Sequence, residues 1–210
     1  MLKKIAIIDH GFGNIQSVVN ACNFCGCLPI VINDPKKLLD FNGAILPGVG
    51  AFGPAIEFLR RTGFDQAIKN YVNAQKMLYG TCLGFQLLFS ISFENGQYEG
   101  LNLIEGTVEK FNFKDKTLKV PHMGWNNVNI LENPFGKKMY RDIKDGENFY
   151  FVHSYYANPK DKSLISSVTD YGIKFCSAIA SKNIWGSQFH PEKSGTAGLK
   201  LMKNFIEACK

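Results

Sequence analysis

A single cysteine, Cys82, stands between two glycines in the stretch LYGTCLGFQLL, residues 78–88. Gly80 and Gly84 each lie two residues from it, which is the spacing of a turn that presents a nucleophile between a strand and a helix. Glycine suits both positions because any Cβ there would collide with the adjoining strand or helix. A helix after Cys82 would also direct free N–H groups at the sulfur and favour the thiolate. The pattern predicts a nucleophilic thiol, with a buried structural cysteine as the alternative.

A histidine and a carboxylate that could activate this thiol lie in the stretch WGSQFHPEKS, residues 185–194. His190 ends an apolar segment, and Glu192 follows two residues later across Pro191. Residues two apart in an extended segment point the same way, and a proline keeps the residue before it extended. Glu192 could therefore orient the imidazole of His190 and favour its charged form once Cys82 ionises. Together the three residues predict a Cys–His–Glu triad, although His-Pro-Glu alone also suits a surface turn.

Two other motifs are incomplete as binding sites. Cys22 and Cys25 form a CxxC pair, but a structural zinc site usually needs four ligands, and no further cysteine pair or histidine cluster supplies them. We predict that these thiols pack in the core and that the chain binds no metal. The turn at Gly11–Gly13 lacks the third glycine of the dinucleotide fingerprint, because Gln16 stands in its place. We expect no cofactor.

The composition is that of an ordinary globular protein. Of its 210 residues 45% are hydrophobic and 20% charged, and the net charge is +6. The lysines are scattered and no basic stripe alternates with aromatic residues, so we expect no nucleic-acid partner. The apolar run near the start ends at Asp9, too early for a signal peptide, and no stretch reaches membrane-spanning length. We predict a cytoplasmic protein with reduced cysteines and no membrane partner.

The elements that would position the triad alternate between strand and helix in the first half. Apolar strands are expected at 3–9, 28–32, within 41–50 and at 77–81, and helices at 14–25 and 53–76. Short strands separated by turns follow at 106–113, 118–130, 148–157, 164–169, 173–180 and 183–190, before a helix at 197–209. Residues 1–210 should therefore form a single α/β domain: a mostly parallel central sheet flanked by helices, with an additional antiparallel strand region in the second half.

Three motifs resemble those of the class I, triad-type glutamine amidotransferases. They are PGVGAF at 47–52, GTCLGFQLL at 80–88 and QFHPEKS at 188–194. DHGFGNIQSV at 9–18, KVPHMGWN at 119–126 and YFVHSYY at 150–156 are similar to the glutaminase subunits of imidazole glycerol phosphate synthases. The resemblance implies a flavodoxin-like fold. The chain departs from the usual family pattern at His10, Thr81 and Phe85, none of which is a catalytic position.

The resemblance also implies a role for each matching residue. Cys82 would attack the side-chain amide of glutamine, His190 would transfer protons and Glu192 would orient it. The PGVG segment matches an oxyanion strand, so the peptide at Val49–Gly50 and the N–H of Leu83 would bind the developing oxyanion. The implied substrate-binding residues are Gly48, Gln86, Glu94, His153, Ser154 and Tyr155. Among them Glu94 would bind the ammonium group of glutamine, and the alternative for Glu94 is a solvated loop acid.

Ammonia released into water would be protonated and lost as a nucleophile, so a second active site must receive it directly. The resemblance implies that the second site lies on a (β/α)₈-barrel cyclase subunit, which would form a heterodimer with this chain. That subunit would make imidazole glycerol phosphate and AICAR in histidine biosynthesis. Met123, Trp125 and Lys193 would lie on the docking face. The alternative for Met123 and Trp125 is ordinary core packing.

Other functions stay open at this point. A paralogous glutaminase could supply ammonia to a synthase that amidinates bacterial surface sugars, because the acceptor binds the partner and leaves no mark on this chain. A stand-alone cysteine hydrolase or peptidase would also use cysteine and histidine, but usually without the PGVG strand and the QFHPE pairing. A docking module without activity would lack an intact triad.

Overall fold

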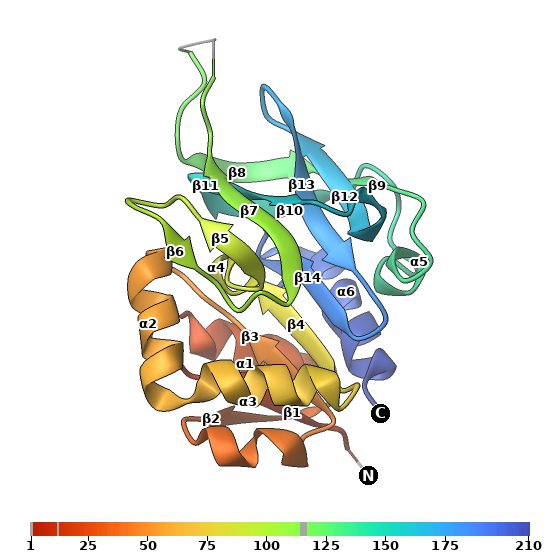
Figure 1. The fold of residues 1–210 in the computed structure, drawn as a ribbon. Helices are drawn as coiled ribbons and strands as arrows, with labels where there is room; N and C mark the ends of the chain where they lie inside the picture. Colours follow the sequence, from red (N-terminus) through yellow and green to blue (C-terminus); the bar gives the residue numbers. More distant parts are fainter. Residues whose placement is uncertain (1, 12, 114–116) are drawn as a thin grey trace.

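The protein is described by a computed structural model over residues 2–11, 13–113 and 117–210 (Figure 1). Phe12, in the turn at Gly11–Gly13, lies outside the described residues. Five parallel strands form one half of the larger sheet in the order β2-β1-β3-β4-β14. They are β1 (Lys4–Ile8), β2 (Leu28–Ile32), β3 (Gly43–Leu46), β4 (Met77–Thr81) and β14 (Ile184–Ser187).

Helices cover both faces of the parallel strands. α2 (Phe52–Thr62) and α3 (Phe64–Asn73) lie on one face, and α1 (Ile15–Phe24) and α6 (Gly195–Ala208) on the other. Successive residues of a strand point to opposite faces, so Ala6 and Ile8 pack towards α2 and α3 while Ile5 and Ile7 pack towards α1 and α6. All four side chains are fully buried. The predicted parallel sheet with two covered faces is therefore confirmed.

An antiparallel region extends the sheet beyond β14, as the second half of the sequence predicted. Its path runs β14-β13-β11-β7-β5-β6, with β12 paired to β13, β9 paired to β12, and one parallel pairing, β5 on β7. The strands are β5 (Phe89–Ser92), β6 (Tyr98–Glu99), β7 (Ile104–Lys110), β9 (Asn129–Ile130), β11 (Tyr155–Pro159), β12 (Ile165–Asp170) and β13 (Lys174–Ala180). A separate antiparallel pair, β8 (His122–Asn127) and β10 (Asn148–His153), makes a second sheet. Short helical segments lie between these elements: η1 (Pro35–Asp40), α4 (Leu83–Gln86), α5 (Gly136–Met139), η2 (Lys162–Leu164) and η3 (Pro191–Lys193).

Two expected elements are each divided in the structure. The segment 148–157 contributes β10 to the small sheet and β11 to the large one, because its two halves pair with different strands. The helical segment 53–76 breaks at Gly63, whose φ of +80° ends α2 in a left-handed turn before α3 begins. Strands β5 and β6 and helix η1 were not predicted.

The cysteines of the CxxC segment pack against the sheet. Cys22 and Cys27 are buried, together with Cys209 from the end of the chain, and the partly buried Cys25 donates its S–H to the Leu199 carbonyl. Core packing is therefore confirmed for Cys22. Within the described residues no group of three or more His, Cys, Asp or Glu side chains is arranged to hold a metal ion. No helix in this part of the chain is long and apolar enough to cross a membrane.

The carboxyl ends of three parallel strands meet at one edge of the sheet. The PGVG segment follows β3, Cys82 follows β4, and His190 follows β14 after two further residues. Ligands of open α/β sheets bind outside the carboxyl ends of the strands. The fold thus brings the three segments singled out in the sequence to one place.

Candidate active site

Cys82 occupies a strained turn between β4 and α4. Its φ of +52° is unusual for a residue with a side chain, and its N–H donates to the Ser187 carbonyl of β14 at 2.8 Å. A Cβ on Gly80 would lie 2.8 Å from the Gly84 carbonyl oxygen, and a Cβ on Gly84 would overlap the Leu46 carbonyl of β3. The predicted need for glycine on both sides of the cysteine is confirmed.

The helix after Cys82 is shorter than expected. α4 covers only Leu83–Gln86, a single turn in which the Gln86 N–H donates to the Cys82 carbonyl at 3.1 Å. A helix dipole grows with the number of aligned peptides, so one turn stabilises a thiolate less than the full helix that we predicted. Most of the stabilisation must come from side chains around the sulfur.

His190 and Glu192 form a buried pair. Nδ1 of His190 lies 2.8 Å from Oε1 of Glu192, and both side chains are only 2% exposed. His190 itself is extended, as expected of a residue before proline, but the Pro191–Lys193 segment is the 3₁₀ turn η3 rather than an extended strand. The predicted contact is therefore present, although a tight turn makes it.

Two hydrogen bonds fix the backbone of His190. The His190 N–H donates to the Tyr150 carbonyl of β10 at 2.9 Å, and the Ser194 hydroxyl donates to the His190 carbonyl at 2.5 Å. Burial by itself lowers the pKa of the imidazole, but the Cys82 sulfur and the Glu192 carboxylate beside it outweigh burial and raise that pKa to about 10. Nε2 of His190 makes no hydrogen bond within the part of the chain that the structure describes. A charged imidazole beside the sulfur favours the thiolate.

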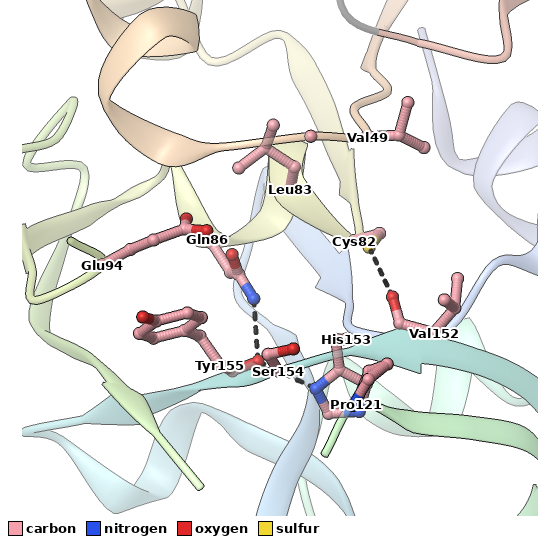
Figure 2. Close-up of a pocket in the computed structure, with 11 residues that line it drawn as sticks. Val49, Cys82, Leu83, Gln86, Glu94, Pro121, Val152, His153, Ser154 and Tyr155 are labelled. Atoms are coloured by element: carbon pink, nitrogen blue, oxygen red, sulfur yellow. Dashed lines mark hydrogen bonds between the residues drawn. The ribbon is translucent and has the colours of Figure 1, made fainter.

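A cavity of about 380 Å³ opens next to Cys82 (Figure 2). It is lined by Val49, Gly50, Cys82, Leu83, Gln86, Glu94, Pro121, Val152, His153, Ser154 and Tyr155. In the view of Figure 2 Cys82 and Glu94 stand at opposite ends of it. Most of the residues singled out in the sequence thus share one cavity, while Gly48, His190 and Glu192 are not in its lining.

Glu94 lies at the start of α2. Its Oε2 accepts the Phe52 N–H at 2.8 Å. Burial raises the pKa of the Glu94 carboxyl, and the hydrogen bond from Phe52 offsets part of that effect. Glu94 is partly buried, lines the cavity and accepts a hydrogen bond from α2, which favours a site residue over a solvated loop acid.

Gln86 is held by two hydrogen bonds within the protein. Its Nε2 donates to the Tyr155 carbonyl at 2.9 Å and to Oε1 of Gln188 at 3.0 Å. Both N–H groups of the amide are therefore used, and Oε1 is the atom that Gln86 can offer to a ligand.

The oxyanion strand is closed against the turn at Cys82. The Leu83 N–H donates to the Gly48 carbonyl at 3.4 Å, whereas we expected this N–H to be available for an oxyanion. The peptide that meets Leu83 is Gly48–Val49, one residue before the Val49–Gly50 peptide named in the sequence analysis. A Cβ on Gly48 would lie 2.9 Å from the Gly84 nitrogen, so only glycine allows this approach.

The structure adds residues that sequence reasoning missed. Pro121 and Val152 line the cavity, and Gln188 is fully buried with its Nε2 3.8 Å from the Cys82 sulfur. The sequence signal for Gln188 was its position two residues before His190, which in an extended segment places both side chains on the same side.

All three of the expected interface residues are exposed. On β8, Met123 is 66% exposed and Trp125 is 59% exposed, with the Trp125 ring 6.2 Å from that of Tyr150. Lys193, at the end of η3, is exposed as well. The alternative that Met123 and Trp125 pack in the core is wrong.

Comparison with known proteins agrees with this geometry. The family model for the class-I glutamine amidotransferases matches residues 6–209. A protein of Geobacter metallireducens called imidazole glycerol phosphate synthase subunit HisH is 43% identical over 208 residues, which cover 97% of this chain and 98% of that protein. The subunit of the same name from Sulfurimonas denitrificans is 46% identical and covers 97% of each chain. The name of these relatives implies a synthase with a further subunit.

Solved structures with little sequence identity share the fold. The structure titled PurLQS from Thermotoga maritima gives a TM-score of 0.77 at 16% identity over 99% of both chains. The glutaminase domain of Trypanosoma brucei CTPS, solved with bound acivicin, gives a TM-score of 0.67 at 18% identity, over 98% of this chain and 94% of that one. On the strength of the family match and the near full-length relatives, the chain belongs to the class-I glutamine amidotransferases and, within them, to the HisH subunits of imidazole glycerol phosphate synthases.

Proposed function

We propose that the chain hydrolyses the side-chain amide of L-glutamine to glutamate and ammonia. The Cys82 sulfur attacks the amide carbon, and His190 gives the leaving nitrogen a proton as the C–N bond breaks. Water, activated by the same imidazole, then cleaves the thioester and releases glutamate. The observation that carries the proposal is the buried His190, which contacts Glu192 at 2.8 Å and carries a pKa raised by Cys82 and Glu192.

Glutamine lies along the cavity between Cys82 and Glu94. Glu94 binds the ammonium group, the backbone of His153, Ser154 and Tyr155 binds the carboxylate, and Gly48 contributes as part of the oxyanion strand. The free Oε1 of Gln86 is available to an N–H of the ligand. The cavity volume of about 380 Å³ suits a molecule of this size.

The oxyanion is bound by the Leu83 N–H together with an N–H of the oxyanion strand, at Val49 or Gly50. In the conformation described here the Gly48 carbonyl occupies the Leu83 donor, so the strand must rotate before the reaction. Rotation of the Gly48–Val49 peptide would remove that carbonyl and turn the Val49 N–H inwards. This supports a resting enzyme that binds glutamine but turns it over slowly.

Ammonia then passes to a (β/α)₈-barrel cyclase subunit, which makes imidazole glycerol phosphate and AICAR in histidine biosynthesis. The exposed Met123 and Trp125, with Lys193 nearby, form the docking face. Residues 1–210 act as one domain, and the heterodimer works in the cytoplasm. The name of the relatives supports this acceptor over a surface-sugar synthase. Family membership supports a glutaminase over a stand-alone peptidase.

Substitution of the nucleophile tests the proposal. Cys82→Ala in the reconstituted heterodimer should abolish glutamine-dependent synthesis, while synthesis from added ammonia at alkaline pH should persist, because only ammonia production is lost. Cys25→Ala, a partly buried cysteine on another face, is the matched control and should keep both activities. Glutamine turnover by the Cys82→Ala enzyme would contradict the assignment.

A further inference from the structure

The side-chain amide of Gln188 has an orientation that the surrounding hydrogen bonds dictate. A backbone carbonyl can only accept, so the atom of Gln86 that meets the Tyr155 carbonyl at 2.9 Å must be its nitrogen. The second N–H of that nitrogen points at the side chain of Gln188. The Gln188 atom that accepts it, 3.0 Å from Nε2 of Gln86, must therefore be the oxygen Oε1. The nitrogen of Gln188 therefore occupies the other side of its amide, where it lies 3.8 Å from the Cys82 sulfur.

The two hydrogen-bonding neighbours of the Cys82 sulfur, the Val152 carbonyl and the Gln188 amide, favour different protonation states of the thiol. The Val152 carbonyl, also 3.8 Å from Cys82, can accept a hydrogen bond from the neutral thiol but offers nothing to a thiolate. The Gln188 N–H, in contrast, gains strength when the sulfur becomes an anion, because hydrogen bonds to charged acceptors are stronger. Loss of the proton to His190 therefore weakens one contact and strengthens the other.

The other charged and titratable groups around Cys82 do not preclude this effect of Gln188 on the sulfur. The charged partners that face it are His190, with Glu192 behind it, and Glu94 across the cavity. His153 of β10 also lines the cavity, but burial lowers its pKa to about 3, so it is neutral.

Gln188 is also held rigidly. Its side chain is fully buried, and its backbone N–H donates to the Ser177 carbonyl of β13 at 2.8 Å. A donor fixed in a buried site needs no reorganisation when charge develops, and such donors are worth more than mobile ones in water.

We propose that Gln188 is a further catalytic residue of this site: its Nε2–H donates to the Cys82 sulfur and stabilises the thiolate relative to the thiol. The same amide holds Gln86 in the orientation that presents Oε1 to glutamine. This inference rests on the proposed role of Cys82 as the nucleophile.

The pH dependence of alkylation at Cys82 tests the proposal without any glutamine turnover. The isolated full-length chain is treated with iodoacetamide between pH 5 and pH 10, and peptide mass spectrometry gives the rate at each cysteine. Gln188→Met and Gln188→Leu are uncharged and each remove the donor to sulfur together with the acceptor for Gln86. In each variant the midpoint of the Cys82 rate profile should move up by about one pH unit, which is about ten-fold slower alkylation below the midpoint.

Two controls separate this role from packing and from the proposed function. Ser187→Ala removes a buried hydroxyl that bonds to Tyr79 and to the Phe189 carbonyl next to Gln188, without touching the sulfur, and should leave the midpoint unchanged. Cys25, whose pKa burial raises to about 11, is the slow internal standard in every sample.

The outcomes are distinct. If wild-type Cys82 reacts quickly but both Gln188 variants keep its midpoint, or if Ser187→Ala shifts it equally, Gln188 has no role in stabilising the thiolate and the proposed glutaminase stands. If wild-type Cys82 reacts no faster than Cys25 at neutral pH, the thiol is not activated, and the proposed function and this inference both fail.

Discussion

Mild acid should destabilise the fold through its buried histidines, and His153 allows the effect to be calculated. Its Nδ1–H donates to the Tyr155 carbonyl at 2.8 Å, and its Nε2 accepts the Nδ1–H of His122 at 2.9 Å. The Nε2 of His122 accepts in turn from Asn126 at 3.2 Å. Both rings are buried and neutral, since burial lowers the pKa of His153 to about 3 and that of His122 to about 4.

The sign and size of this pH effect on stability follow from the difference in proton binding between the folded and the unfolded chain. Below the ordinary histidine pKa of 6.5 the unfolded chain binds a proton at His153, while the folded chain binds none until about pH 3. Stability is therefore complete above 6.5 and falls as the pH drops below it. At pH 5 the loss from His153 is about 2 kcal/mol, from 1.36 kcal/mol for each of about 1.5 pH units. His122 and His10, whose pKa values burial also lowers, act in the same direction.

Urea unfolding at a series of pH values between 5 and 7 measures this loss. In the His153→Gln variant the dependence of unfolding free energy on pH should fall by up to about 1.4 kcal/mol per pH unit relative to the wild type. His190→Gln is the control near pH 5, where the ring of His190 is protonated in both states and its removal should leave the slope unchanged; towards pH 7 the unfolded ring loses its proton and the folded ring does not, so there its removal should make the slope more positive. The carboxylates are the same in each chain and cancel in the comparison. An unchanged slope in His153→Gln would show that His153 is not a buried neutral histidine.

Three further predictions concern the site. His190→Ala should lower glutaminase kcat by roughly 10⁴-fold or more, whereas Glu192→Gln should lower it less, because it removes orientation rather than proton transfer; equal losses in steady-state assays would contradict this order. Gly84→Ala, whose Cβ would overlap the Leu46 carbonyl, should lower the Tm by about 5 °C or more, while Gly13→Ala, whose Cβ would come no closer than 3.4 Å to the side chains of Ile15 and Pro47, should change it little in calorimetry. The isolated chain should show a kcat at least about 10²-fold below that of the substrate-loaded heterodimer with a similar KM, and a high kcat from the lone chain would refute a closed oxyanion strand.

Local sequence was sufficient to predict the structure where a residue pattern is compatible with only one local arrangement. The apolar run MLYGT was predicted as a strand and forms β4 with the same bounds, Met77–Thr81. The glycines around Cys82 indicated a close approach of two chain segments, and the Leu46 carbonyl and the Gly84 backbone make that approach. The contact between His190 and Glu192 was predictable as well, because two residues in sequence span it.

Sequence reasoning failed where distant partners decide the outcome. NFYFVHSYYA reads as one strand, yet it divides before Tyr155 because β8 pairs with its first half and β7 and β13 with its second. Gln188 was missed for a related reason. Its amide faces the sulfur only because the Tyr155 carbonyl orients Gln86, and these three residues are far apart in sequence.

The oxyanion strand shows a third limit, since its sequence permits more than one backbone conformation. The hydrogen bond from Leu83 to the Gly48 carbonyl is long, at 3.4 Å, so breaking it costs no more than about 1 kcal/mol. Losing one oxyanion donor from a transition state costs about 2.7–4 kcal/mol. A partner that rotates the Gly48–Val49 peptide therefore breaks a weak bond and frees a donor that matters only when the oxyanion forms. Because glutamine itself carries no oxyanion, the rotation should change kcat far more than it changes the affinity for substrate.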